Sequence, residues 1–343
     1  MLGHFYKRPG TSANWLMNRR HFLAALMSAC ALPARAEQPR LRALLGGYQT
    51  SAMLVLRGGR SLFEYGDLAR TSYIASARKS LVSMLYGPAV ANGKIRLDRT
   101  LAEMSFDDIG GLLPRERQAT IRDLLMARSG VYHKAANSGD ASDRAPPRGS
   151  VEPGHYFLYN NWDFNALGAI YERETGRDFY RAFAEDIAVP IGLKDYRVAE
   201  QAIRNDTHLS DYPARHFVLS TRDMAALGQL MLQEGRWEKR QVIAADWVAR
   251  TTALATPAAE IMRTSPFVEG LGYGWLWWVF DAAGPWPDAL KGAYTASGAF
   301  GQFITVVPKL DMVVAHKVVA PSDLNVPAED YLHKILPTAL TLV

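Results

Sequence analysis

The sequence has little of the chemistry that cysteine and metal-binding residues provide. Its 343 residues include one cysteine, Cys30, which lies in an N-terminal segment that we expect to be removed. The remaining chain can therefore form no disulfide, and it offers no cysteine nucleophile or thiolate metal ligand. The eight histidines show no His-x-x-x-His or other ligand spacing. The sequence thus predicts no metal site and no cofactor.

Two further absences exclude other classes of protein. No Gly-x-Ser-x-Gly motif is present, which disfavours an α/β-hydrolase fold. The apolar run from Phe22 to Leu32 is too short to span a bilayer. We therefore expect neither that hydrolase architecture nor stable membrane insertion of the processed chain.

The first 36 residues are typical of an export signal. A basic start is followed by the apolar run, and Ala34-Arg35-Ala36 forms an A-x-A cleavage site. The pair Arg19-Arg20 resembles the twin-arginine signal, so residues 1–36 predict export to the bacterial periplasm. Lipid attachment at Cys30 is an alternative, and Met17 is an alternative to Met1 as the first residue.

The net charge of +5 comes from this segment. It contains five of the 39 Lys and Arg residues and none of the 34 Asp and Glu residues, so the chain from Glu37 onward has equal numbers of each sign. The composition therefore gives no support for a nucleic-acid partner.

Strand-like runs lie near both ends of the chain, and helical patterns lie between them. Segments 51–56 and 61–65 predict a hairpin, and three β-rich runs follow residue 272. This order predicts an α+β fold with an antiparallel sheet built from both termini, flanked by helices, and an inserted helical region. We expect a sheet domain of residues 37–95 and 215–343, and a helical domain of residues 96–214.

One helix carries a pair of residues that can do chemistry together. The segment that begins at Ser76 is apolar most of the way round, which predicts a buried helix. Ser76 and Lys79 stand three residues apart, so they share a face of that helix and the amine can reach the hydroxyl. Backbone N–H groups of the first turn are available to stabilise negative charge on a substrate oxygen. This arrangement is typical of a serine hydrolase.

Three landmarks follow one another in an informative order. Ser76-Ala77-Arg78-Lys79 comes first, Pro153-Gly154 then leads into Tyr159-Asn160-Asn161, and Gly298-Ala299-Phe300-Gly301-Gln302 precedes a late strand. This order resembles the serine β-lactamase-related superfamily, which includes class C β-lactamases, penicillin-binding proteins, esterases and 6-aminohexanoate-oligomer hydrolases. The resemblance covers nearly all of the chain after residue 36 and implies the β-lactamase/transpeptidase-like fold.

The resemblance also implies roles for individual residues. Ser76 corresponds to the nucleophile, Lys79 to a base, Tyr159 to a proton-handling group and Asn161 to a residue that orients Lys79 or the substrate. The base must be a neutral lysine or a tyrosinate, so we expect a lowered pKa and leave the choice between Lys79 and Tyr159 open. The implied oxyanion hole uses the N–H groups of Ser76 and Ala299.

The third motif departs from the family pattern. No Lys-Thr-Gly precedes the last strands, and Ser297-Gly298 stands in that region, with Ser297 as a partial replacement for the missing hydroxyl. Without that lysine a substrate carboxylate loses its partner. We therefore expect a small-molecule ester or amide substrate. The alternatives are a weak β-lactamase or D-amino peptidase, and a non-catalytic protein that binds cell-wall peptide or a partner.

Two segments are expected to shape the site. The loop of residues 133–154 is long for a compact domain and is expected to form a wall of the site. The run Tyr273-Gly274-Trp275-Leu276-Trp277-Trp278 is expected to be one strand whose aromatic residues divide between the core and an apolar cleft.

Overall fold

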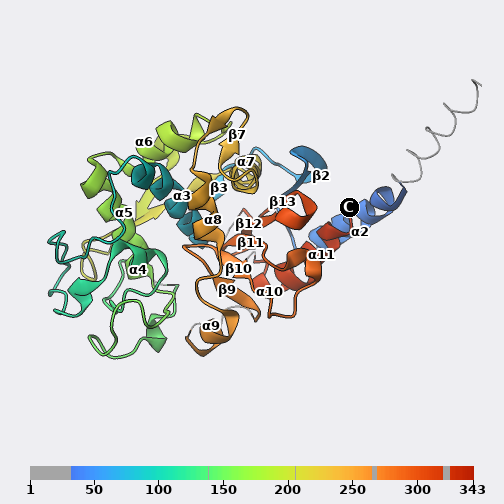
Figure 1. Cartoon of the computed structure of the whole chain (residues 1–343). Coiled ribbons are helices and arrows are strands. Elements are labelled where there is room, and N and C mark those ends of the chain that lie inside the picture. The colour runs from blue at the N-terminus through green and yellow to red at the C-terminus, as the bar shows by residue number, and fades with distance from the viewer. Residues whose placement is uncertain (1–31, 138, 205, 265–268, 320–324) are drawn as a thin grey trace, which may run out of the picture.

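The computed structural model describes residues 32–343, except 138, 205, 265–268 and 320–324 (Figure 1). The predicted arginine pair and Cys30 therefore lie outside the described residues. Ala34 to Ala36, the predicted cleavage site, lie in the first helix, α2 (Leu32–Gly47). Leu41 and Leu45 of α2 are buried in the core, and both follow the predicted cleavage point.

A seven-stranded antiparallel sheet forms the centre of the described structure. Its strand order is β2-β1-β13-β12-β11-β10-β9. The strands are β1 (Ala52–Arg57), β2 (Arg60–Gly66), β9 (Leu271–Tyr273), β10 (Trp278–Phe280), β11 (Tyr294–Gly298), β12 (Gln302–Val307) and β13 (Met312–Lys317). Outside the sheet, short strand pairs are β3 (Ser72–Tyr73) with β6 (Val218–Leu219), β4 (Ala202–Arg204) with β5 (Ala214–His216), and β7 (Arg236–Trp237) with β8 (Arg240–Gln241).

The two ends of the chain meet in the middle of this sheet. The N-terminal hairpin β1–β2 joins the C-terminal strands through β1 and β13, in a register that places Ala52 opposite Lys317. All six residues of β13 are buried, which fits a central strand covered on both faces. The predicted α+β fold, with a sheet built from both termini, is confirmed.

Helices supply the remaining layers. After α2 they are α3 (Arg78–Ala91), α4 (Ile121–Leu125), α5 (Asn161–Thr175), α6 (Phe179–Phe183), α7 (Thr221–Leu232), α8 (Ala245–Thr252), α9 (Ala258–Thr264), α10 (Ala328–Asp330) and α11 (Leu336–Leu340). A π-helical segment, Tyr331–Ile335, joins α10 to α11. None of the helices in the described part of the chain is long and apolar enough to cross a membrane.

Helices cover both faces of the sheet (Figure 1). On one face lies α7, where a Cβ added at Gly228 would come 2.6 Å from Val313 and 2.9 Å from Ile304. Only a glycine allows so close an approach of helix to strand. On the other face Tyr331 stacks on Phe303, with ring centroids 3.9 Å apart. Because side chains alternate along β12, Phe303 and Ile304 anchor opposite layers.

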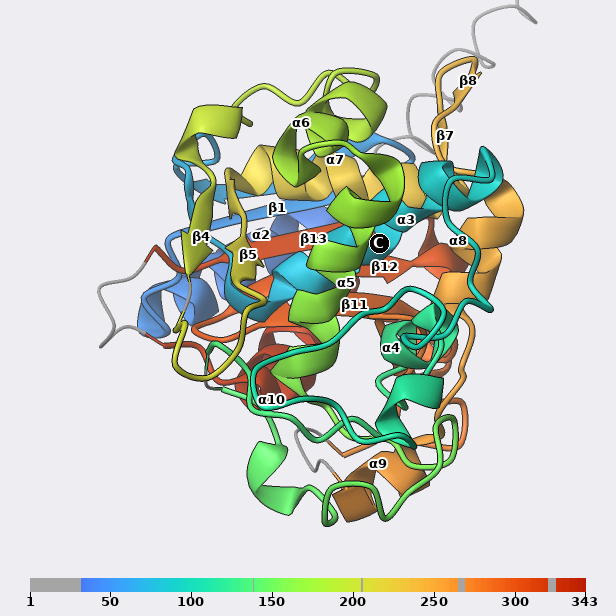
Figure 2. The ribbon, with the colours of Figure 1, turned by 90° about the vertical axis from the view of Figure 1, so that its left-hand side faces the viewer.

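The helical region packs against the sheet through α3. In Figure 2 the helix α5 lies across α3, and Tyr86 of α3 donates a hydrogen bond to the Leu167 carbonyl of α5 at 2.7 Å. Between residues 96 and 214 much of the backbone is irregular, which includes most of the 133–154 loop. The proposed domain boundaries stay a prediction.

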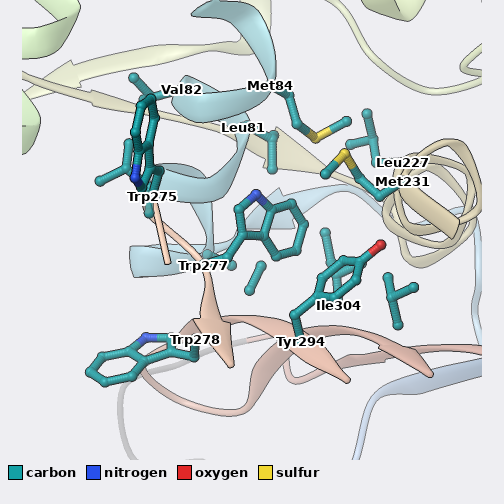
Figure 3. Close-up of a cluster of buried hydrophobic side chains, with 14 of the residues drawn as sticks. Leu81, Val82, Met84, Leu227, Met231, Trp275, Trp277, Trp278, Tyr294 and Ile304 are labelled. Atoms are coloured by element: carbon teal, nitrogen blue, oxygen red, sulfur yellow. The ribbon is translucent and has the colours of Figure 1, made fainter. Parts of the chain in front are cut away.

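The aromatic run near residue 275 differs from the single strand that we expected. β9 ends at Tyr273 and β10 begins at Trp278, and Leu276 has a left-handed φ of 65° in the turn between them. Figure 3 shows Trp277 pointing toward Leu81 of α3 and Met231 of α7, and Trp278 pointing away from them. Trp278 is also buried, and it lines the cavity of the candidate site. The strand prediction was wrong because the chain turns back on itself, but the division between core and cleft holds.

Candidate active site

Ser76 lies in a 3-10 turn, η1 (Ala75–Ala77), that runs directly into α3. We expected an α-helix that begins at Ser76. Instead Ser76 lies in one turn of the tighter 3-10 helix, and the α-helix begins at Arg78. Just before Ser76, Ala75 has φ of +49°, a conformation that costs free energy in a residue with a Cβ. The pairing of β3 with β6 and a bond from Ile74 N to the Phe217 carbonyl hold this segment in place.

The structure brings the three predicted catalytic side chains together. Lys79 Nζ donates to Ser76 Oγ at 2.7 Å and to Tyr159 OH at 2.8 Å. Lys79 is 2% exposed, and its ammonium group lies 4.5 Å from the ring centroid of Tyr159 and 4.9 Å from that of Phe164. The amine is therefore enclosed by aromatic rings and touches water very little.

Burial acts in opposite directions on the two candidate bases. It lowers the pKa of the Lys79 ammonium well below its usual value, and the positive charge of Arg78 lowers it further, while Asp140 raises it. Burial raises the pKa of the Tyr159 hydroxyl, against smaller lowering effects of Ser76 and Arg78. The expected lowered pKa is found for Lys79 and not for Tyr159, because loss of water disfavours the charged form of each group.

The end of β11 reaches the nucleophile. A Cβ added at Gly298 would lie 2.4 Å from the Ile74 oxygen and 2.8 Å from the Ala77 nitrogen, so the strand passes directly against the η1 turn. The loop of residues 299–301 then turns back into β12, with left-handed φ angles at Phe300 and Gly301. Ala299 thereby lines the same cavity as Ser76, which is compatible with the role that the resemblance implies for it.

A cavity of about 310 Å³ opens at this point. It contains Ser76, Tyr159, Ser297, Gly298 and Ala299 among its lining residues. Its other described walls are Gly139, Leu271, Trp278, Phe300, Asn325, Val326, Pro327 and Ala328. Of the predicted 133–154 loop, Gly139 is the described residue at the cavity wall.

Asn161 is placed differently from the other predicted residues. Its backbone N–H donates to Asp140 Oδ2 at 2.6 Å, and its side-chain amide donates to the Asn137 carbonyl at 3.4 Å. These bonds tie the start of α5 to the 133–154 loop. The N-cap of α5 is the preceding residue, Asn160, whose side chain accepts from the Asp163 N–H at 2.8 Å.

Sequence reasoning missed three groups around Lys79. Arg78 and Asp140 both act on its pKa, and Phe164 covers it. One signal was available, because an arginine within an otherwise apolar helix indicates a buried charge. Nothing in the sequence pattern connects Asp140 with Lys79, since they meet only through the path of the loop.

The geometry defines a serine site in which one buried lysine contacts both the serine and a tyrosine. Among the described residues no group of three His, Cys, Asp or Glu side chains is arranged to hold a metal ion. The family model described as Beta-lactamase matches residues 40–318, and the chain belongs to that family.

Solved structures with this fold have varied activities. EstCE1, a hydrolase with promiscuous acyltransferase activity, superposes with a TM-score of 0.66 at 15% identity, over 90% of this chain and 99% of its own. A penicillin-binding protein homologue from Caulobacter crescentus gives 0.65 at 14% identity, over 90% and 98%. A penicillin-binding protein from Bacillus halodurans gives 0.63 at 15% identity, over 88% and 100%. At these identities the likeness concerns the fold.

A curated relative adds an acyl-transfer activity to this group. Monacolin J acid methylbutanoyltransferase from Aspergillus terreus is 29% identical over 153 residues. The match covers 36% of this chain and 36% of the relative, so it spans about a third of each protein.

Proposed function

We propose that this protein is an exported serine hydrolase that forms an acyl-enzyme on Ser76 and cleaves small, uncharged esters or amides. The observation that carries the proposal is the position of Lys79 Nζ, which is 2.7 Å from Ser76 Oγ and 2.8 Å from Tyr159 OH, on a residue that is 2% exposed. A neutral amine at that distance can accept the serine proton as Oγ attacks a carbonyl carbon.

The two steps of the reaction use the same three side chains. In the first, the Ser76 Oγ–carbonyl bond forms, its proton passes to Lys79, and Tyr159 gives its proton to the departing alkoxide or amine. Tyr159 is then reprotonated from Lys79 across their hydrogen bond. In the second, water attacks the acyl carbon and gives a proton to the same pair. The bond from the acyl carbon to Ser76 Oγ breaks, Oγ takes that proton back, and the acid is released. The N–H groups of Ser76 and Ala299 hold the oxyanion in both steps.

The cavity favours an uncharged substrate. Among its described lining residues none carries a formal charge, and Leu271, Trp278, Phe300 and Val326 make much of its wall apolar. A substrate carboxylate placed there would lose hydration and gain no cation from these described residues. This supports short acyl esters over penicillins, whose carboxylate needs a charged partner.

Acyl transfer to an alcohol is a second candidate. The methylbutanoyltransferase relative and the promiscuous acyltransferase activity in EstCE1 favour it. The chemistry differs only in the nucleophile of the second step, because an alcohol replaces water at the acyl carbon. The ratio of ester exchange to hydrolysis, measured with p-nitrophenyl butyrate and added short alcohols, separates the two activities.

Covalent labelling tests whether the site is catalytic. We expect a fluorophosphonate to modify the folded protein on the Ser76 peptide, as identified by mass spectrometry. Ser76→Ala should abolish the adduct, and Ser61→Ala, on the exposed part of β2, should not. A Ser76 peptide that stays unmodified in the folded protein would favour the non-catalytic alternative, a protein that binds cell-wall peptide or a partner.

A substrate comparison tests the reaction class. We would measure kcat/KM for p-nitrophenyl butyrate, a chromogenic cephalosporin, a D-alanyl peptide and a linear 6-aminohexanoate dimer, with Ser76→Ala as the blank. The ester should lead. A cephalosporin turned over faster than the ester would show that this is a β-lactamase in which another group replaces the lost lysine.

Export to the periplasm is part of the proposal and rests on the sequence of residues 1–36. Expressed in a bacterium with a working twin-arginine pathway, the protein should be recovered from the periplasm with Glu37 as its N-terminus. Arg19→Lys/Arg20→Lys should block this transport. Cytoplasmic recovery of the parent chain with residues 17–36 attached would contradict export, and a lipid-modified Cys30 would favour the alternative of an anchor.

A further inference from the structure

The first residue of α3 is a buried arginine without an acidic partner. Arg78 is 2% exposed, and its Nη2 donates to Asn165 Oδ1 at 3.0 Å. Its Nη1 is buried and has no hydrogen-bond partner. No ion pair within the described part of the chain includes Arg78. Burial of such a cation costs free energy that a structural role alone does not explain.

A second buried arginine shows how a buried positive charge is usually balanced, by an acidic partner. Arg215, 6% exposed, forms an ion pair with Glu172, so its charge is balanced. Arg78 has instead the neutral amide oxygen of Asn165, and the amide nitrogen of Asn165 donates to Asn137 Oδ1 at 2.9 Å. An amide acceptor fixes the guanidinium in position and leaves its positive charge intact. This charge is adjacent in sequence to Lys79.

The groups around the two basic side chains, Lys79 and Arg78, come from several elements. Lys79 is hydrogen-bonded to Ser76 and Tyr159. The charge of Asp140 raises the pKa of Lys79, and the charge of Lys79 lowers the pKa of His216. The ionisable groups that interact electrostatically with Arg78 come from β3, β5, α6 and the segment before α5: Tyr73, Arg215, His216, Tyr180 and Tyr159. Asp140 is the acid in this set, and its effect on the pKa of Lys79 is opposite to that of Arg78. Burial lowers the pKa of the Arg78 guanidinium. A guanidinium starts from so high a pKa that it still carries its charge near neutral pH.

We propose that Arg78 is a positioning residue of the site, a fixed buried cation that keeps Lys79 an uncharged amine able to accept the Ser76 proton. Arg78 and Lys79 are consecutive residues of α3 and each is 2% exposed, so little water separates or screens their charges. Two positive charges in such a setting repel, and the one that can lose its proton does so. The same charge favours negative charge on Tyr159 when that hydroxyl gives up its proton. Asn165 accepts a hydrogen bond from Arg78 but, being neutral, does not balance its charge.

This inference deepens the proposed function, and the experiment that tests it reads Lys79 directly. The ¹³Cε resonance of Lys79, assigned by its loss in Lys79→Arg, is followed by NMR from pH 5 to 10 in the full chain. Arg78→Met removes the cation, and Asn165→Asp cancels it with a carboxylate of nearly the same shape. We expect both variants to raise the midpoint of Lys79 titration by about one pH unit or more.

Two matched variants separate charge from packing. Arg78→Lys keeps the charge and should keep the midpoint near that of the parent, and Asn165→Ala removes the amide but adds no charge and should do the same. The rate of Ser76 labelling by a fluorophosphonate should shift its acid limb in parallel with the NMR midpoint. Thermal unfolding identifies any variant that fails to fold. If Arg78→Met does not fold, the Lys79 midpoint in Asn165→Asp tests the inference in its place.

The outcomes are distinguishable. A Lys79 midpoint that is unchanged in folded Arg78→Met or Asn165→Asp would overturn the inference and leave Arg78 as a packing residue. A shifted midpoint in a protein whose Ser76 is never labelled would support the role of Arg78 and count against the proposed function.

Discussion

Gly298 and Ile74 lie so close that no side chain fits between them. A Cβ on Gly298 would come 2.4 Å from the carbonyl oxygen of Ile74, closer than non-bonded atoms approach. This contact brings the end of β11 to the turn that carries Ser76. The distance between the nucleophile and the proposed oxyanion donor, Ala299, thus depends on a missing side chain.

Gly298→Ala should therefore disturb the site more than the fold. We expect kcat to fall by about 10²-fold or more, the scale of losing an oxyanion donor, because β11 must move away from η1. Gly47→Ala is the control, since a Cβ there meets nothing within 4 Å. Equal activities in the two variants would show that β11 does not position Ala299.

Lys79 and Tyr159 should behave as one unit. Lys79→Ala and Tyr159→Phe are each expected to lower kcat by about 10² or more with the fold intact, the scale of a general acid or base. Because they share one proton path, the double variant should lose little more than either single one. Lys94→Ala and Tyr65→Phe are the controls. Additive losses in steady-state assays would argue against the shared path.

Phe300 should set the size of the acyl group. Its ring lines the cavity from the β11–β12 turn, so Phe300→Ala opens space beside the acyl carbon. The ratio of kcat/KM for p-nitrophenyl octanoate to that for the butyrate should rise by about tenfold, since each buried methylene contributes to binding. Val189→Ala, at a side chain that is 75% exposed, should leave the ratio unchanged. A ratio that does not rise would place the acyl chain elsewhere.

Lys317 should make stability increase with pH. It is buried on β13, its Nζ donates to the carbonyls of Arg70 and Leu219, and burial lowers its pKa from 10.5 to about 7. Between these values the unfolded chain binds more protons than the folded one. The free energy of unfolding therefore gains up to about 1.4 kcal/mol per pH unit from this group.

Urea unfolding of Lys317→Met from pH 7 to pH 10 measures that contribution. The variant should lose the positive slope, so the parent chain gains stability relative to it as pH rises. Lys309→Met, at an exposed lysine, should keep the slope of the parent. Parallel curves for the parent chain and Lys317→Met would mean that Lys317 titrates normally.

The sequence predicted the parts of the site that lie within single segments. Ser76 and Lys79 are three residues apart where the η1 turn runs into α3, and the continuous helical winding alone brings their side chains together. Likewise the β1–β2 hairpin followed from two β-type runs around a glycine pair. These features need no knowledge of the rest of the fold, because the interactions that fix them are local.

The aromatic run near Trp277 shows where local patterns fail. Alternating large residues are typical of one strand, yet the left-handed Leu276 reverses the chain between β9 and β10. A residue with a Cβ adopts that conformation only when surrounding packing compensates for its cost. Part of that support comes from α3, which is distant in sequence, because Ser80 donates a hydrogen bond to the Leu276 carbonyl at 2.6 Å.

The sequence by itself determined the order of the motifs, the three-residue spacing of Ser76 and Lys79 at the start of a helix, and the sheet made from both termini. Only the tertiary structure decided the electrostatic state of the site. Burial under Tyr159 and Phe164, and the unbalanced charge of Arg78, favour a neutral Lys79 and a protonated Tyr159. The reason is physical: a pKa depends on the water and charges around a group, and those are assembled from segments far apart in the chain.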